Sequence, residues 1–311
     1  MNDATMWRLA LARQIGAAYG VSPNVAAVYI AGSVARGWAD RYSDIELDVY
    51  WSTPPSDPER LDIIRRAGGE VDVHWGAPPG DAEYRAMLRK LHGHVSQVWP
   101  YEDFEWSEHF YIHGVNIGVS AFLVETMDNW LADVVERFDT DDEKHMRVAA
   151  VQNAIPVHGD QQIARWKAAI RYPDELAYAL IAEQLVVDES WWQCDMLAGR
   201  NAVIPLMALF VAMERRILRI LLALNRVFLP DPRFKWADRL ITQMPIAPVD
   251  LGKRLRWVYR AEPAAAVAEL QRLMEEVLDL VDQALPGRDT AFAREWLSYR
   301  RVVWDQSPQV S

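Results

Sequence analysis

The sequence contains a single cysteine, Cys194, among its 311 residues. One cysteine cannot form an internal disulfide, and it excludes a zinc site built from several cysteines, which fits a protein of the reducing cytoplasm. The chain also lacks a long basic block, and its formal net charge is −11. Nonspecific binding of DNA or RNA requires phosphate neutralisation by Lys and Arg, so this composition argues against a nucleic-acid partner.

Long uncharged apolar runs are absent as well. The longest apolar stretch, residues 202–228, is interrupted by one glutamate and three arginines between positions 214 and 219, which predicts a buried helix rather than a membrane span. The N-terminal residues MNDATMWRLALARQIG contain an acidic residue and two arginines, so they predict an amphipathic helix and not a signal peptide. We therefore expect no membrane partner.

The first 125 or so residues mix strand and helix signals. A short apolar run at 25–31 and a strictly alternating segment at 44–51 predict two strands. Two further segments, 104–113 and 115–125, are split at Gly114 and predict a β-hairpin. The pattern also predicts a short helical stretch at 34–37, a helix from Asp57 to Gly68, a strand at 70–75 and a helix at 81–91.

From Thr126 onward the pattern becomes helical. The breaks between segments contain Pro, Gly or Asp, as helix boundaries commonly do. The expected helices are 127–138, 142–154, 160–171, 173–188, 201–226, 233–243, 262–285 and 290–303. A mixed half followed by a helical half predicts an α+β protein with two domains, 1–126 and 127–311, and a cleft between them.

Three acids occupy alternate positions of one predicted strand: Asp44, Glu46 and Asp48. Side chains on a strand alternate between faces, so these carboxylates share one face at intervals of about 7 Å, and the apolar residues between them point into the core. A solvated strand face would explain the pattern, but Asp is depleted in strands and like charges repel. A divalent cation such as Mg²⁺, which prefers carboxylate oxygens, would relieve that repulsion.

The turn before this strand contains Gly32 and Ser33. Glycine permits close backbone approach, and a serine at the start of a short helix offers a hydroxyl and a backbone N–H to an anion. Alone, the pair indicates an ordinary strand-to-helix turn. Followed eleven residues later by two carboxylates at i and i+2, it matches what phosphoryl or nucleotidyl transfer requires.

These residues resemble a known signature. Gly32-Ser33 followed by Ser43-Asp44-Ile45-Glu46-Leu47 looks like the motif of the DNA polymerase β-like nucleotidyltransferase superfamily, Gly-Ser or Gly-Gly, about ten residues, then Asp-x-Asp/Glu in a strand. The nearest likeness is the small bacterial branch of aminoglycoside and lincosamide nucleotidyltransferases, in which a polymerase-β-like domain with a mixed sheet precedes a helical domain. The stretch LLALNRVFLPDPRFKW, residues 221–236, also resembles a helix junction in the helical domain of such relatives.

The resemblance implies a set of site residues. Gly32 and Ser33 would hold the β- and γ-phosphates of a nucleoside triphosphate, and Asp44 and Glu46 would bind two Mg²⁺ ions that bridge them. An acceptor hydroxyl would attack the α-phosphorus and release pyrophosphate. Further candidates for nucleotide binding are Arg36, Arg41, Ser43 and Lys235. Each has a simpler explanation as well: solvated arginines, a serine that caps a turn, and an exposed lysine beside a packed Trp236.

The superfamily usually has a third acid on a later strand, and this chain departs from that pattern. The predicted strand at 115–124 carries Asn116 and Gly118 where relatives could have an acid. Asp72 and Asp48 are substitutes by residue type, and a general base could instead come from the helical half, where the candidates are Glu183, Glu189 and Asp195. His109 and His113, four apart on a strand, would lie about 13 Å apart and are not a zinc pair.

The sequence thus predicts an Mg²⁺-dependent nucleotidyltransferase that moves a nucleoside monophosphate to a small hydroxylated acceptor. An acidic protein would suit a cationic acceptor such as an aminoglycoside antibiotic, which would make the enzyme a resistance factor. Two alternatives remain open: a nucleotide-binding protein of the same fold without catalysis, and a nucleotidyltransferase that modifies a protein or an RNA. The oligomeric state does not follow from the sequence.

Overall fold

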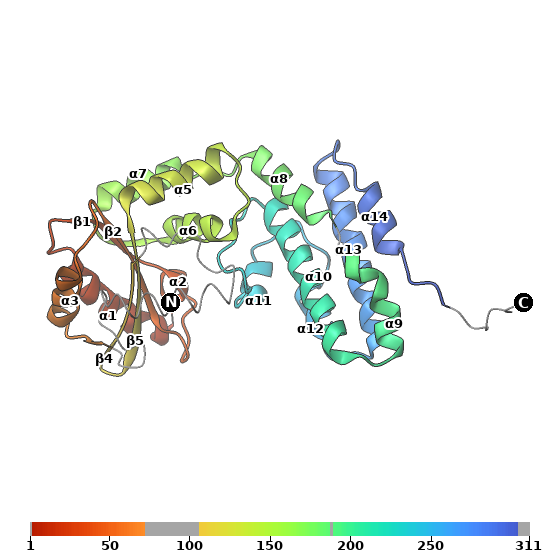
Figure 1. Cartoon of the computed structure of the whole chain (residues 1–311), viewed down its shortest axis with the longest axis horizontal. Coiled ribbons are helices and arrows are strands. Elements are labelled where there is room, and N and C mark those ends of the chain that lie inside the picture. The colour runs from red at the N-terminus through yellow and green to blue at the C-terminus, as the bar shows by residue number, and fades with distance from the viewer. Residues whose placement is uncertain (1, 72–105, 187–188, 304–311) are drawn as a thin grey trace, which may run out of the picture. The chain divides into compact units, whose positions relative to one another are not determined.

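The computed structural model describes residues 2–71, 106–186 and 189–303 (Figure 1). The helix expected at 81–91 and the candidate Asp72 lie outside the described residues. Contacts divide the chain into two compact units. The first comprises Met1–Arg137 and Arg147–Arg171, and the second comprises Phe138–Met146 and Tyr172–Ser311. The sequence predicts two domains, 1–126 and 127–311. Contact-defined units are not the same as independently folding domains, so this boundary stays a prediction.

A mixed sheet of six described strands forms the centre of the first unit, in the order β3-β4-β5-β2-β1-β6 (Figure 1). Strands β2 and β5 pair in parallel, and the other neighbours pair antiparallel. The strands are β1 Val25–Ile30, β2 Ile45–Trp51, β3 Glu70–Val71, β4 Trp106–Ile112, β5 Val115–Leu123 and β6 Ile155–His158. With the surrounding helices this sheet confirms the α+β expectation.

The alternation in β2 sets which face of the sheet is the main core. Ile45, Leu47, Val49 and Trp51 are all buried in one hydrophobic cluster. Helices α1 (Asp3–Tyr19) and α3 (Asp57–Arg66) pack on this side and contribute apolar side chains to the same cluster. Both helices have side-chain N-caps: the Asn2 oxygen accepts a hydrogen bond from the Thr5 N–H at 2.8 Å, and Ser56 caps α3 in the same way.

The opposite face carries an aromatic cluster at the C-terminal end of β2. Tyr50 stacks near Tyr29, with ring centres 5.6 Å apart, and lies 4.6 Å from the ring of Trp166. Phe122 of β5 meets Trp130 edge-on at 4.9 Å. The two tryptophans belong to α5 (Val124–Glu136) and α7 (Asp160–Ala169), so these helices cover this end of the sheet.

Strand β6 corrects the expectation that everything after Thr126 is helical. It lies between α6 (Asp142–Asn153) and α7 and pairs antiparallel with β1, where Tyr29 faces Pro156. In the sequence, Pro156 predicts only a break between two helices and gives no sign of a strand. A proline is tolerated here because β6 is an edge strand, on which a missing N–H breaks no ladder.

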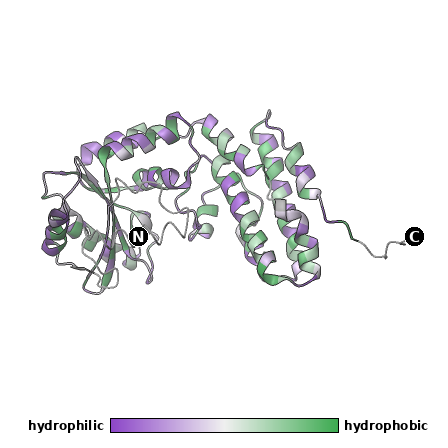
Figure 2. Ribbon diagram, in the orientation of Figure 1, coloured by the Kyte–Doolittle hydropathy of each residue, from purple (hydrophilic) through white to green (hydrophobic). Residues whose placement is uncertain are grey.

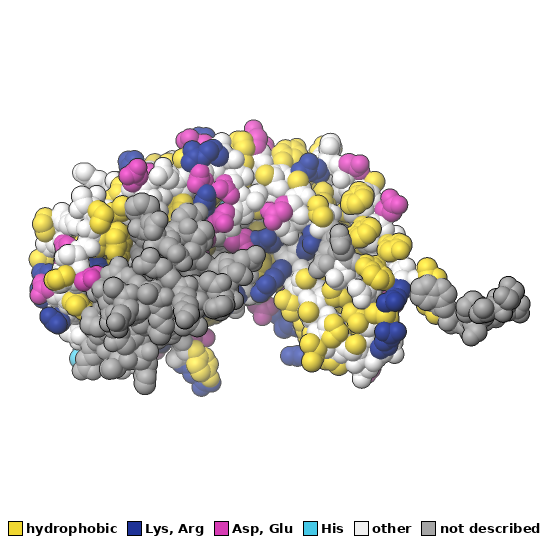
Figure 3. Space-filling view, viewed as in Figure 1, with side chains coloured by type: hydrophobic (Ala, Val, Ile, Leu, Met, Phe, Trp, Pro, Cys, Tyr) yellow, Lys and Arg dark blue, Asp and Glu magenta, His cyan; other side chains and the backbone are white. Residues whose placement is uncertain are grey.

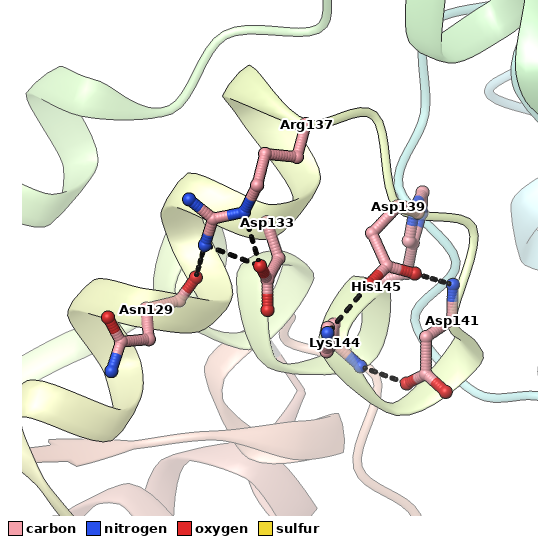
Figure 4. A network of polar contacts seen from close by, with 7 residues as sticks. All are labelled: Asn129, Asp133, Arg137, Asp139, Asp141, Lys144 and His145. Carbon is pink, nitrogen blue, oxygen red and sulfur yellow. Dashed lines mark hydrogen bonds and ion pairs between the residues drawn. The ribbon is translucent and has the colours of Figure 1, made fainter.

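Polar contacts define how α5 ends and how α6 begins (Figure 4). In the last turn of α5, the Arg137 Nε donates to Asp133 at 2.7 Å. At the start of α6, the Asp141 carboxylate accepts from the Lys144 N–H at 3.1 Å, as an N-cap does. The Lys144 ammonium in turn donates to Asp139 at 2.6 Å.

The second unit is helical. Its long helices α10 and α13 pack against each other and carry many of its hydrophobic residues (Figure 2). Arg254 donates to Glu269 at 2.6 Å and to both oxygens of Glu276 at 2.7 Å, which ties α12 to α13. The elements are α8 Asp174–Gln184, η1 Glu189–Gln193, α9 Cys194–Gly199, α10 Val203–Leu224, α11 Ala237–Ile241, α12 Leu251–Val258, α13 Pro263–Ala284 and α14 Ala291–Ser298.

The expected helices at 201–226 and 262–285 are confirmed as α10 and α13, and the helix expected at 290–303 is shorter, since α14 ends at Ser298. The sequence pattern missed η1, α9 and α12, which are short. None of the described helices combines the length and apolar character that a membrane span requires. On the face seen in Figure 3, Lys and Arg side chains are scattered, many of them beside Asp or Glu.

A buried acid in β4 distinguishes the core of the first unit. Glu108 is 2% exposed and faces α1 and α3, and the Arg60 guanidinium lies 3.4 Å from its Oε1. Burial raises the pKa of Glu108 to about 7, although Arg60 opposes the shift. The unfolded chain therefore releases this proton near pH 4.5, and the native state keeps it until about pH 7.

We predict that Glu108 makes the protein less stable as the pH rises from 4.5 to 7. The native state binds more protons in that window, and the shift corresponds to about 3 kcal/mol. Urea unfolding of Glu108→Gln should therefore show a free energy of unfolding that increases, relative to the wild type, by about that amount across the window. Glu136→Gln, at an exposed position, should show a constant difference. A constant difference for Glu108→Gln as well would contradict the prediction.

Candidate active site

The Gly-Ser turn and the acidic strand are in direct contact. The Ala31 N–H donates to the Glu46 carbonyl at 3.0 Å, and helix α2 (Gly32–Ala35) begins at the next residue. Gly32 has φ +60°, and a Cβ built on it would lie 1.4 Å from the Glu46 Oε2. The carboxylate thus occupies the space that any other residue at position 32 would need, so the close approach requires glycine.

Ser33 lies in the first turn of α2 and is 8% exposed. Its carbonyl accepts from the Trp38 N–H at 2.8 Å, which closes the short helix. The Ser33 hydroxyl forms no hydrogen bond with another described residue. Ser33 thus directly follows the glycine that contacts the carboxylate of Glu46.

The loop between α2 and β2 is fastened to α1. The Asn2 amide donates to the Ala39 carbonyl at 2.9 Å, and the Arg8 Nε donates to the Ser43 carbonyl at 2.8 Å. Burial lowers the pKa of Arg8, and the nearby carboxylates of Asp40 and Asp44 oppose the shift. These bonds hold the loop that leads into the acidic strand.

Ser43 has a role within this loop. Its hydroxyl accepts from the Asp40 N–H at 3.0 Å and donates to the Asp40 carboxylate at 3.2 Å. The Tyr42 N–H also donates to Asp40, and it is the main reason that the pKa of this carboxyl is lowered. Ser43 therefore caps the turn, the simpler of the two roles that the sequence allowed, and nucleotide binding by Ser43 stays a prediction.

The two loop arginines lie beside aromatic rings. The Arg36 guanidinium is 5.7 Å from the ring centre of Trp38, and that of Arg41 is 4.6 Å from Tyr42, which is 78% exposed. Both are cation–π distances. Their predicted contacts with phosphate stay predictions.

The three acids of the expected face have different environments. Asp44 is half-buried just before β2, Glu46 is exposed, and Asp48 is 3% exposed. The Arg147 guanidinium from α6 lies 3.7 Å from the Asp48 carboxylate and 4.5 Å from the ring centre of Phe122. Asp48 is thus buried beside an arginine, and its role as a third acid stays a prediction.

The sheet register shows what stands next to Glu46. Gly118 of β5 is its direct partner, and His109 of β4 is the partner of Gly118 on the other side. From the sequence, His109 was considered only together with His113 as a pair of zinc ligands, and that pair was excluded. Its partner there, His113, lies outside β4 in the hairpin turn.

The other candidates belong to the second unit. Asp195 accepts from Arg300 at 2.8 Å, Glu183 lies 3.9 Å from Arg219, and Glu189 is in η1. Lys235 lines a pocket of about 510 Å³. The other lining residues are Glu214, Trp236, Ala237, Asp238, Arg239, Ile241, Gly252, Leu255, Arg256 and Tyr259. The roles proposed for these acids and for Lys235 stay predictions.

The described residues contain no group of three or more His, Cys, Asp or Glu side chains arranged to hold a metal ion. Mg²⁺ usually takes one or two carboxylates from the protein and completes its shell with phosphate oxygens and water. Asp44 and Glu46 therefore suit a cation that arrives with a phosphorylated ligand, rather than a metal held by protein ligands alone.

No protein-family model and no curated protein matches the chain. Among solved structures, it is similar to a nucleotidyltransferase-like protein from Exiguobacterium sibiricum 255-15, with 11% identity over 90% of this chain and 80% of that chain. The TM-score is 0.34, which is too low to carry an argument about this protein.

Two glycines with left-handed backbone give a matched test of the contact between the turn and Glu46. Gly32 has φ +60° and Gly37 has φ +72°, but a Cβ at Gly37 would meet nothing within 4 Å. We expect each Gly→Ala change to cost about 1–2 kcal/mol in urea unfolding because the backbone strain is alike. Only Gly32→Ala should also displace the Glu46 carboxylate and abolish the triphosphate binding that the sequence predicts, measured by calorimetry. Equal binding by the two variants would contradict this.

Proposed function

We propose that the protein is a nucleotidyltransferase that transfers a nucleoside monophosphate from a nucleoside triphosphate to a hydroxyl of a small acceptor. The observation that carries the proposal is the contact of Gly32 with the carboxylate of Glu46. Because of it, a turn suited to phosphate and a carboxylate suited to a cation share one site. The sequence resemblance to the polymerase β-like superfamily points to the same chemistry.

Each residue has a stated part in this reaction. The Ser33 hydroxyl and the backbone of the turn, Gly32 included, bind the terminal phosphates, and the missing Cβ of Gly32 admits the carboxylate of Glu46 beside them. Asp44 and Glu46 hold Mg²⁺, which when bound neutralises phosphate charge and favours departure of pyrophosphate. A new bond then joins the acceptor oxygen to the α-phosphorus while the bond to the bridging oxygen of pyrophosphate breaks. The hydroxyl proton leaves with a base.

The charge of the protein indicates the chemistry of the acceptor. The net charge of −11 favours a cationic acceptor, and a hydroxylated aminoglycoside has that chemistry. A protein or RNA acceptor is the second enzymatic candidate. A nucleotide-binding protein without catalysis is the candidate from another class, and the environment of Asp48 favours it, because that acid is held by Arg147.

The proposal predicts that Asp44→Asn and Glu46→Gln abolish Mg²⁺-dependent triphosphate binding while the fold survives. Each variant removes one of two like charges from the site, so the loss costs little stability, and it takes away one cation ligand. Thermal shift with each of the four nucleoside triphosphates, with and without Mg²⁺, measures binding, and pyrophosphate release measures transfer. Asp62→Asn, an exposed acid on α3, is the control. Wild-type binding by both site variants would refute the metal assignment, and binding without pyrophosphate release across acceptors would favour the non-catalytic alternative.

Ser33→Ala should weaken triphosphate binding by about 1–3 kcal/mol, because a charged phosphate loses a donor. Alanine at this position keeps the backbone of α2 unchanged, so the free energy of unfolding in urea should change little. Isothermal titration with a triphosphate analogue that resists cleavage separates affinity from turnover. Unchanged affinity would show that the turn does not bind phosphate.

A further inference from the structure

Glu46, Gly118 and His109 form one row across three strands. The register pairs Glu46 with Gly118 in the parallel ladder, and Gly118 with His109 in the antiparallel ladder. Residues paired in a ladder point to the same face of a sheet. Their chain neighbours Ile45, Ile117 and Phe110 belong to the hydrophobic cluster, so the row lies on the opposite face.

The middle position of this row lacks a side chain, and the imidazole of His109 lies beside that gap. A Cβ at Gly118 would be 3.7 Å from the His109 Cε1 and 4.0 Å from its Nδ1. Both Glu46 and His109 are exposed. With a strand spacing of about 4.8 Å, their Cα atoms are about 10 Å apart, and no side chain from position 118 stands between them.

Among the described residues of the sheet, the other polar side chains next to this row are poor proton acceptors. Next to Gly118 along the same face of β5 are Asn116 and Ser120, and Tyr111 is the partner of Asn116. Asp48, two residues after Glu46 in β2 and the partner of Ser120, lies beside Arg147. In the proposed function Asp44 and Glu46 hold the cation. A neutral imidazole, by contrast, offers one nitrogen that can accept a proton.

We propose that His109 is a catalytic residue of this site, which hydrogen-bonds the acceptor hydroxyl and takes its proton. The inference rests on the proposed function. As the acceptor oxygen bonds to the α-phosphorus, its O–H bond breaks and the proton passes to an imidazole nitrogen. The bond between the α-phosphorus and the bridging oxygen breaks, and pyrophosphate leaves with that electron pair. His109 afterwards returns the proton to solvent.

The test uses two matched histidine variants of the same hairpin, His109→Asn and His113→Asn. Water serves as the acceptor, and pyrophosphate release is followed with each nucleoside triphosphate and Mg²⁺. Loss of a positioned proton acceptor should lower kcat at least about 100-fold in His109→Asn. The Kd of an α,β-methylene triphosphate analogue should change less than about threefold, since the phosphate and cation ligands stay. His113→Asn, in the turn, should match the wild type in both measurements.

A carboxylate at position 118 provides a second variant. The Gly118 backbone is not left-handed, and a Cβ there would lie 3.7–4.0 Å from the His109 ring and the Ile45 carbonyl, which is ordinary contact distance, so Asp should fit. We expect Gly118→Asp to restore pyrophosphate release at least tenfold in the His109→Asn background, because it returns a proton acceptor to the row. A wild-type kcat in His109→Asn, or a loss that accompanies an equal loss of affinity and is not restored, would overturn the inference.

A spectroscopic measurement separates this inference from the proposed function. Nitrogen NMR of the imidazoles, with the His109 signal assigned from the His109→Asn spectrum, should show that signal shifting when the Mg²⁺ complex of the analogue binds. If the wild type binds the analogue and the His109 signal does not move, the inference falls and the proposed function stands. If the wild type binds no triphosphate with Mg²⁺, both fall.

Discussion

The close approach of Gly32 to Glu46 is the constraint on which the arrangement of the site depends. A left-handed residue at position 32 turns the chain from β1 into α2, and the absence of a Cβ admits the carboxylate of the neighbouring strand. The hydrogen bond from the Ala31 N–H to the Glu46 carbonyl fixes β1 against β2 at this level. Anchoring of the loop by Arg8 then limits how the acidic strand can enter the sheet. Turn, loop and strand therefore form one local unit.

This arrangement divides one face of the sheet into two environments. At the C-terminal end of β2, Tyr50 and its aromatic neighbours are covered by α5 and α7, and the residues of β2 itself are buried there. Asp48 lies between the two environments and is paired with Arg147, because an unpaired buried carboxylate would be costly in free energy. At the other end Glu46 is exposed. Within β2, the exposed carboxylate is thus at the end of the strand next to Gly32.

Much of the first unit could be predicted because its signals are local. Strict alternation in β2 gave its buried face, and the break at Gly114 gave the hairpin. Strand β6 was missed because four residues with a proline carry no periodicity, and its identity depends on pairing with β1 from far along the chain. The row that brings His109 beside Gly118 depends on cross-strand register, which a single strand does not encode. Residue type suggested Asp48 as a third acid, and the sequence did not show that Arg147, 99 positions later, lies 3.7 Å from its carboxylate.

The hairpin turn determines which residues of β4 face the site. His113 and Gly114 both have positive φ, at 51° and 75°, and Ile112 pairs with Val115, as in a two-residue type I′ turn. This turn fixes the register, so Glu108 points into the core and its neighbour His109 points to the opposite face. A slip by one residue would exchange them and put an imidazole against Arg60 and a carboxylate beside Gly118. The raised pKa of Glu108 and the exposure of His109 are therefore two consequences of one turn, and the chemistry of the open face depends on a pair of residues that lie outside it.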